Sequence, residues 1–260
     1  MRRAIDWMTL TRLGAFSVKL ASVLAVLIVW QIAATSGVVN PLFISYPTEI
    51  IREFGTYFGS GGAGWSDLSA SGVVFFWGFG ASIVIGVPIG ILLGWFRLLD
   101  IAASPIVMVL YNSPRIAFAP LFVIWFGLGD FSKSAVVFIC AVFPIIMSVR
   151  AGIETIEPSL LAMSRSFGAN IPQMLWNVVL PGSVPSIGAG IRIGIGQAIM
   201  GVVLAEFISG SSGLGYRVVL GTNQFETALV FAAVIVIALI GGLAAAVLGR
   251  VEQYLGRWRT

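Results

Sequence analysis

The segment from Glu157 to Pro181, EPSLLAMSRSFGANIPQMLWNVVLP, decides how the rest of this chain is interpreted. It is the one long, fairly polar segment in an otherwise apolar sequence. Its pattern predicts two short helices joined at Gly168, because glycine most easily adopts the left-handed backbone that ends a helix. Each piece has about ten residues, whereas a helix that crosses a bilayer needs about twenty. We therefore expect this pair at the membrane surface, where it can contact a soluble partner.

Local rules predict where these two helices begin and end. Pro158 follows Glu157, and proline at the first helical position loses no needed hydrogen bond. Asn170 and Gln173 have the spacing of a capping box for the second helix. That helix is expected to end before Pro181, since proline cannot donate to the preceding turn.

Composition predicts the class of protein. The chain is 58% hydrophobic and only 10% charged, with a mean hydropathy of +1.00, whereas a soluble domain has about a quarter of its residues charged. We therefore expect an all-α integral membrane protein with a single domain over residues 1–260. The basic pI of 9.6 does not indicate nucleic acid, because the arginines cluster at the ends of apolar runs. The chain contains no histidine, and the single cysteine, Cys140, excludes an internal disulfide and a zinc site.

Six apolar runs are long enough to be membrane spans, at about 17–35, 71–96, 101–126, 134–149, 184–208 and 228–248. The third is interrupted by Pro105, Pro114 and Pro120. Between the spans we expect a short surface helix from near Pro47, a flexible loop at 60–66, turns at 97–100 and 127–133, and a glycine-rich loop over 209–226. The first run also loosely fits a signal peptide, but further spans follow it.

Glycines spaced four apart lie on one face of two spans. Gly86, Gly90 and Gly94 form such a stripe in the second span, and Gly190 and Gly194 form one in the fifth. Small residues at this spacing let helix backbones approach closely in lipid. Packing within one subunit and contact between subunits are both open.

The lysines and arginines outside the span centres indicate the orientation. With a cytoplasmic N-terminus, ten lie inside and three, Arg52, Lys133 and Arg217, lie outside. Cytoplasmic loops carry the excess of basic residues, so both termini and the Glu157–Pro181 segment are expected in the cytoplasm. The inside set is Arg2, Arg3, Arg12, Lys19, Arg97, Arg150, Arg165, Arg250, Arg257 and Arg259.

Ionisable residues at membrane depth are the remaining functional candidates, since each costs a few kcal/mol there. Arg115 either lines the solute path or makes a structural pair. For Arg192 and Glu206 structural pairing is the favoured interpretation. The candidate translocation path consists of Asn112, Ser113, Arg115, Gln197, Met200 and Glu206. No phosphate-binding G-x-x-x-x-G-K-[ST] motif and no hydrolase signature occur, so the chain is not expected to be an enzyme.

Several motifs resemble one known family. Residues 162–168, AMSRSFG, followed after nine residues by VVLP, are similar to the E-A-A-x3-G-x9-I-x-L-P signature of bacterial ABC importer permeases. NSPRIAFAPLFVIWFGLG at 112–129, GIR at 190–192 and AEFISGSSGLG at 205–215 resemble the nitrate/sulfonate/taurine-type branch. The resemblance covers about residues 70–250. Ala162 stands where the family usually has glutamate, so a charged contact between this side chain and the ATPase is not expected.

The resemblance implies a type I ABC importer permease fold, with a cytoplasmic coupling helix between the fourth and fifth spans, in the bacterial inner membrane. It implies a homodimer, two cytoplasmic ATPase subunits that carry ATP and Mg, an extracytoplasmic solute-binding protein, and a small organic or inorganic anion as solute. No cofactor is expected in this chain. The implied coupling residues are Leu161, Ala162, Met163, Ser164, Arg165, Ser166, Phe167, Gly168 and Ala169. An ion-gradient-driven transporter or channel and a membrane-embedded enzyme are the alternatives.

Overall fold

A computed structural model describes residues 12–37 and 43–255, and all regular elements of that part are helices. The chain forms two compact units. Unit 1 combines the residues up to Gly64 with Val218–Ala233, and unit 2 combines Trp65–Arg217 with the residues from Val234 onward. The single domain predicted for 1–260 stays a prediction. Arg2, Arg3, Arg257 and Arg259, which contributed to the predicted orientation, lie outside the described residues.

Unit 1 is built on two helices, α2 (Arg12–Thr35) and α3 (Pro47–Phe58). The indole of Trp30 donates to the carbonyl of Ser45 at 3.1 Å, and the side chain of Gln31 accepts from the amide of Thr48 at 3.2 Å. These bonds attach the start of α3 to the last turns of α2. The short helix predicted from near Pro47 is therefore confirmed.

Unit 2 contains the remaining helices, of which α11 and α12 continue into unit 1. Its elements are α4 (Gly64–Trp95), α5 (Arg97–Asn112), a 3₁₀ turn (Arg115–Phe118), α6 (Ala119–Phe126), α7 (Asp130–Glu154), α8 (Pro158–Ser166), α9 (Ile171–Met174), a π-helical turn (Leu175–Val179), α10 (Leu180–Ser209), α11 (Leu214–Gln224) and α12 (Thr227–Leu255).

Across both units, the described residues contain five helical stretches that are apolar and long enough to cross a membrane, and a bent pair makes a sixth. They are Gly14–Thr35, Gly64–Trp95, Asp130–Glu154, Ile171–Ser209 and Thr227–Arg250, with Arg97–Asn112 and Arg115–Phe126 as the pair, bent by 90°. The six predicted spans are thus confirmed. The break in the third lies at Pro114, whereas Pro105 lies inside α5 and Pro120 in the first turn of α6.

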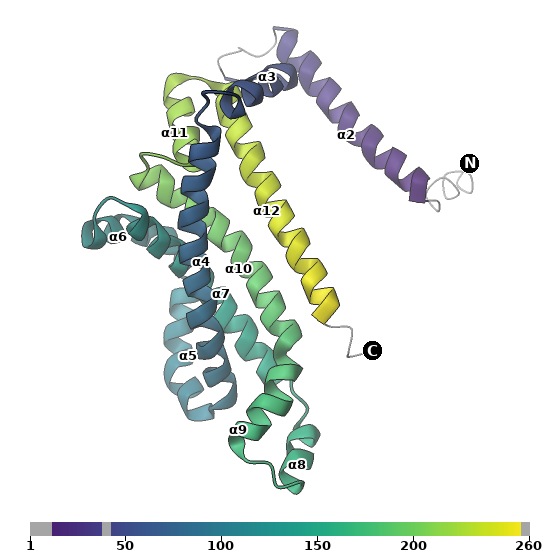
Figure 1. The fold of residues 1–260 in the computed structure, drawn as a ribbon, viewed down its shortest axis with the longest axis vertical. Coiled ribbons are helices and arrows are strands. Elements are labelled where there is room, and N and C mark those ends of the chain that lie inside the picture. The colour runs from purple at the N-terminus through teal and green to yellow at the C-terminus, as the bar shows by residue number, and fades with distance from the viewer. Residues whose placement is uncertain (1–11, 38–42, 256–260) are drawn as a thin grey trace. The chain divides into compact units, whose positions relative to one another are not determined.

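The glycine stripe of α4 lies against α7 of the same chain (Figure 1). A Cβ atom at Gly90 would lie 2.7 Å from Cβ of Val149, and one at Gly94 would lie 2.8 Å from Cβ of Ile153. Both distances are shorter than any tolerable contact. The two backbones can approach this closely only because these side chains are absent.

The stripe of α10 faces the same helix from another side. A Cβ at Gly190 would lie 2.8 Å from Cβ of Ser148, and one at Gly194 would lie 3.0 Å from the side chain of Ile145. Ile145 is fully buried. Both stripes are therefore covered within this chain and do not support a contact between subunits.

Two sequence-based boundaries in the second half of the chain are wrong. The helix that begins at Ile171 does not end before Pro181, because helical backbone continues to Ser209 through the π-helical turn. Such a local widening lets a membrane helix accommodate proline. The predicted loop over 209–226 contains α11, and only Gly210 to Gly213 connects it to α10.

Three boundaries in the first half also move, each by extension of a helix. α4 starts at Gly64, so the flexible loop predicted at 60–66 is shorter. Residues 97–100 are the first turn of α5 and not a separate turn. α7 starts at Asp130, which places Lys133 within the helix. Polar residues in a first helical turn resemble turn residues in composition, so periodicity alone missed these starts.

Candidate functional site

The central segment, residues 157–181, has the local geometry that its sequence predicts at its first half. Glu157 is the N-cap of α8, Pro158 follows it, and Gly168 has a φ of +79°. The capping box is formed in both directions, because the amide of Gln173 donates to Asn170 and the amide of Asn170 donates to Gln173, each at 2.9 Å. The turn between α8 and α9 is therefore held by its own backbone and caps.

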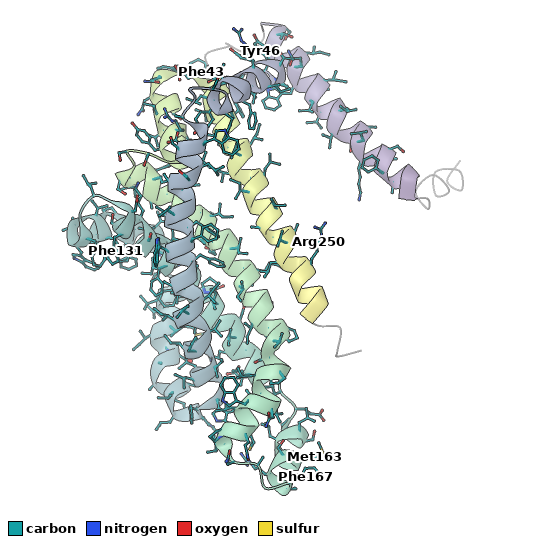
Figure 2. All side chains as sticks on the ribbon, viewed as in Figure 1. Phe43, Tyr46, Phe131, Met163, Phe167 and Arg250 are labelled. Atoms are coloured by element: carbon teal, nitrogen blue, oxygen red, sulfur yellow. The ribbon has the colours of Figure 1, made fainter. Side chains whose placement is uncertain are left out.

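One side of the central segment is anchored and the other is exposed. Met174 and Val179 are buried, and Leu161 packs on the main apolar core. In contrast, Phe167 is 84% exposed and Met163 is 54% exposed, both at the tip of the segment (Figure 2). Among the predicted coupling residues, Ala162, Met163, Arg165, Ser166, Phe167 and Gly168 are exposed, and Leu161, Ser164 and Ala169 are half-buried.

The predicted path residues lie at the end of α5, in the 3₁₀ turn that follows it, and on α10. Asn112 and Ser113 donate to the carbonyls of Met108 and Val109, so both close the last turn of α5. On α10, Gln197 is half-buried and Met200 is exposed. A role for these four residues in the path stays a prediction.

Arg115 lies in the 3₁₀ turn between α5 and α6. Its Nη1 donates to the carbonyl of Cys140 in α7 at 3.0 Å, and its guanidinium lies 5.5 Å from the centre of the Tyr111 ring. The side chain is thus engaged by two neighbouring helices.

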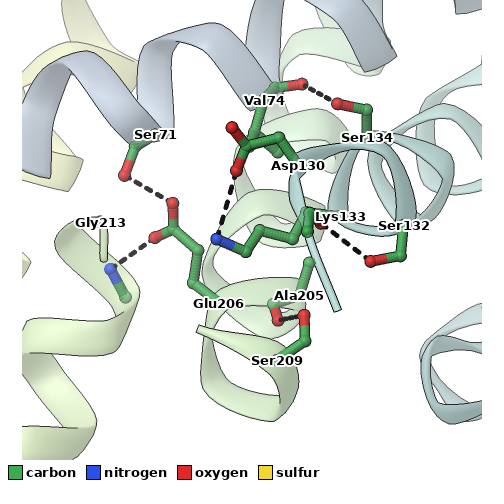
Figure 3. Close-up of polar contacts among 12 residues, drawn as sticks. Ser71, Val74, Asp130, Ser132, Lys133, Ser134, Ala205, Glu206, Ser209 and Gly213 are labelled. Atoms are coloured by element: carbon green, nitrogen blue, oxygen red, sulfur yellow. Dashed lines mark hydrogen bonds and ion pairs between the residues drawn. The ribbon is translucent and has the colours of Figure 1, made fainter. Parts of the chain in front are cut away.

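Glu206 is the centre of a buried polar cluster at the C-terminal end of α10 (Figure 3). It is 1% exposed, and its carboxylate accepts from the hydroxyl of Ser71 and from the amide of Gly215, both at 2.7 Å. The amide of Leu214 in turn donates to the oxygen of Ser71 at 2.9 Å. The structure therefore places Glu206 in a contact that joins α4, α10 and α11.

A second carboxylate completes this cluster. Asp67 in the first turn of α4 accepts from the amide of Gly213 at 3.0 Å and from Nε of Arg217. Two carboxylates thus lie at the N-terminus of α11, where negative charge is favoured by the helix dipole. We call Asp67, Ser71, Glu206 and Arg217 the carboxylate clamp.

Lys133 lies beside the clamp at the start of α7 (Figure 3). It is 3% exposed, and its Nζ is 3.5 Å from Asp130. From the sequence alone, Lys133 and Arg217 are placed outside the spans, and neither Asp67 nor Ser71 is singled out. The signal that could have found Asp67 and Lys133 is the extension of the helical pattern to Gly64 and Asp130, which brings both residues into helices.

The clamp also borders a cavity. Ser71 and Glu206 line a space of about 750 Å³ whose other walls are mostly apolar side chains of α4, α10 and α12. Within the described residues there is no group of three or more acidic, histidine or cysteine side chains able to hold a metal ion.

These features define a class of protein: a multi-pass helical membrane protein in which a short surface-exposed helical segment lies between the fourth and fifth spans. Residues 86–259 match the family described as "binding-protein-dependent transport system inner membrane component", and the chain belongs to this family of ABC importer permeases.

Two relatives illustrate the branch. The chain is 33% identical over 240 residues to the taurine transport system permease protein TauC of Escherichia coli (strain K12), covering 90% of this chain and 87% of that protein. It is 30% identical over 234 residues to a putative aliphatic sulfonates transport permease protein, SsuC, of Bacillus subtilis (strain 168), covering 90% and 84%. The predicted nitrate/sulfonate/taurine-type branch is confirmed.

Solved structures confirm the fold. The MetNI methionine ABC transporter, in inward-facing conformations, matches with a TM-score of 0.61 at 22% identity over 74% of this chain and 94% of that chain. A bacterial ABC transporter that imports the acidic polysaccharide alginate matches with a TM-score of 0.59 at 16% identity over 97% and 93%. The all-α type I importer permease fold is therefore established.

Proposed function

We propose that this chain is the permease subunit of an ATP-driven importer, that it forms the path for a small sulfonate-type anion, and that the central segment couples it to cytoplasmic ATPase subunits. The observation that carries the coupling is the continuity of Ile171–Ser209. At about 1.5 Å per residue, this 39-residue stretch is about 58 Å long, longer than the roughly 30 Å bilayer core. A force applied at α9 therefore acts directly on a membrane span.

The exposed apolar tip supports docking of a partner at this segment. Phe167 and Met163 expose large apolar side chains although Met174 and Leu161 beside them are packed. Contiguous exposed apolar residues mark interaction sites. The partner is an ATPase subunit that carries ATP and Mg, because the family transports with separate ATPases and this sequence has no phosphate-binding motif.

The remaining parts of the proposal follow from the family. The permease acts as a pair of identical chains with two ATPase subunits and an extracytoplasmic solute-binding protein in the bacterial inner membrane. Both termini and the central segment face the cytoplasm. Reaction of Phe167→Cys with a membrane-impermeant thiol reagent, in a Cys140→Ala background, tests this orientation: labelling in inverted vesicles only is expected, and labelling in intact cells would contradict it.

The coupling test compares two exposed phenylalanines. Phe167→Asp is expected to abolish co-purification of the ATPase subunit and transport-linked hydrolysis, whereas Phe131→Asp, at a residue 70% exposed at the start of α7, should retain both. Gly168→Pro should behave like Phe167→Asp, because it distorts the turn that holds the tip. Survival of hydrolysis and transport in both variants would overturn the coupling role.

The solute is proposed from the taurine and aliphatic sulfonate relatives. Proteoliposomes that contain the permease, its ATPase and its binding protein should take up taurine, and excess ethanesulfonate should compete more strongly than nitrate. Uptake that is unaffected by either sulfonate would contradict this solute class.

A further inference from the structure

Arg115 occupies the break in the third span, between the end of α5 at Asn112 and the start of α6 at Ala119. The two helices meet at 90°, and α6 turns away from α5 beside α7 (Figure 1). The Arg115 side chain reaches across this break to the carbonyl of Cys140 and to the ring of Tyr111. One guanidinium group therefore contacts both α5 and α7.

The carbonyl of Cys140 lacks its usual helical hydrogen-bond donor because of the residue four positions later in α7. In an α-helix it would accept from the amide of residue 144, but that residue is Pro144, which has no N–H. A carbonyl without a donor is costly in an apolar environment. Membrane helices tolerate proline where a neighbouring group satisfies the freed carbonyl.

The surroundings leave this carbonyl far from bulk water. Cys140 is 5% exposed, and it packs in an apolar cluster with Val136, Ala119 and Ala205. Ala119 and Ala205 come from α6 and α10, so this cluster covers the point where the three helices meet. A long side chain that ends in several N–H donors can reach such a site, and Arg115 does so at 3.0 Å.

A second contact fixes the other end of α5 on α7. Arg150 of α7 binds Asp100 in the first turn of α5, with Nε 2.7 Å from the carboxylate. The broken span is thus attached to α7 at two places, by an ion pair near the start of α5 and by Arg115 beyond its end.

We propose that Arg115 is a positioning residue: its guanidinium replaces the amide that Pro144 lacks and thereby fixes the broken third span on α7. In this role the side chain does not bind the transported anion. The bend at Pro114 and the missing amide at Pro144 are therefore structurally linked. Arg115, next to the bend, supplies the donor for the Cys140 carbonyl that Pro144 leaves without one.

This role predicts that the effect of Arg115→Met depends on whether Pro144 is also substituted. Arg115→Met alone should lower the maximal rate of taurine uptake about tenfold with a KM for taurine changed by less than twofold. In a Pro144→Ala background the new amide serves Cys140, so Arg115→Met should then lower the rate by less than twofold. Pro88→Ala is the matched control, since Pro88 lies inside α4 and leaves the carbonyl of Val84 without its helical amide donor, so it should give no rescue. Arg115→Lys, which keeps a charged donor, should retain more activity than Arg115→Met.

A readout of helix geometry makes the test independent of the proposed function, on which the uptake assay rests. Spin labels at Ile106→Cys in α5 and Ile124→Cys in α6, both exposed positions, report the angle of the break in a Cys140→Ala background that keeps the backbone carbonyl. Arg115→Met should broaden the distance distribution and Pro144→Ala should narrow it again. If Arg115→Met does not accumulate in membranes, restored accumulation with Pro144→Ala but not Pro88→Ala supports the proposal.

Three results would overturn it. One is a large rise in the KM for taurine with an unchanged maximal rate, which would make Arg115 an anion ligand. Another is an equal loss from Arg115→Met with and without Pro144→Ala. The third is an unchanged distance distribution in Arg115→Met. If the unsubstituted protein does not take up taurine but the spin-label distances change as expected, only the proposed solute is contradicted.

Discussion

The hydroxyl of Ser71 in α4 donates a 2.7 Å hydrogen bond to the carboxylate of Glu206 in α10, although the two residues are 135 positions apart in the chain. The other oxygen of the same carboxylate accepts from the amide of Gly215. Glu206 therefore holds the start of α11 and a turn of α4 against the end of α10. Because α10 also continues into the central segment, one continuous helical stretch connects the proposed coupling segment with the carboxylate clamp.

Replacement of Glu206 should destabilise the protein. Glu206→Leu leaves the Ser71 hydroxyl and the Gly215 amide without their acceptor, and we expect the free energy of unfolding to fall by about 3 kcal/mol. Glu206→Gln keeps one carbonyl oxygen and should cost less. Thermal unfolding of the purified protein in detergent measures both. Glu226→Gln, at an exposed position, is the control and should change the midpoint little.

Gly213 should not accept any side chain. Its φ is +110°, and a Cβ there would overlap the carboxylate of Glu206. Gly213→Ala should therefore lower stability by at least about 2 kcal/mol and release the clamp. Gly196→Ala in α10 is the matched control, because a Cβ there meets nothing within 4 Å. The control should be neutral or slightly stabilising, and an equal loss in both variants would contradict the assigned clash.

The glycine stripe of α4 predicts a similar contrast within one helix. A Cβ at Gly90 would lie 2.7 Å from Val149 and 2.9 Å from the carbonyl of Ile146, so Gly90→Ala forces α4 away from α7. We expect a cost of about 1–3 kcal/mol, as for other overpacked cores. A Cβ at Gly80, in the same helix, meets nothing within 4 Å, and Gly80→Ala should be tolerated. The same detergent unfolding measurement distinguishes them.

The capping box at the central segment should act locally. Asn170→Ala removes the acceptor of the Gln173 amide, and a lost N-cap costs about 1 kcal/mol. Hydrogen exchange at the start of α9 should become about fivefold faster, with little change in the global unfolding midpoint. Ser164→Ala is the control, because its hydroxyl bonds only to the carbonyl of Leu160 in its own helix. Unchanged exchange in Asn170→Ala would contradict a capping role in solution.

The spans and the first half of the central segment could be predicted because their signals are local. Length and apolarity reveal a span without reference to the rest of the chain. The start of α8 depends on the adjacent residues Glu157 and Pro158, and the cap of α9 depends on Asn170 and Gln173, which are three residues apart. The starts of α4 and α7 were missed because Asp67 and Lys133 are polar residues in the first turns of these helices, where they resemble loop residues in composition.

The candidate functional residues likewise separate into features with local signals and features that depend on distant contacts. The sequence predicts Glu206 and Arg115 as ionisable groups at membrane depth, but it does not show what each side chain contacts. Ser71, the acceptor at Cys140 and the covered faces of both glycine stripes all depend on which helices lie side by side. The break lies at Pro114, whereas Pro105 lies inside α5 and Pro120 lies in the first turn of α6, where a missing amide costs no intrahelical hydrogen bond.

The amino-acid sequence by itself determined that this chain is a six-span helical permease with a short helical segment between its fourth and fifth spans. Hydropathy, caps and the left-handed glycine are properties of a few adjacent residues, so they needed no fold to be recognised. Only the tertiary structure decided how the buried charges and freed carbonyls are satisfied, because those hydrogen bonds join residues that are far apart in the chain.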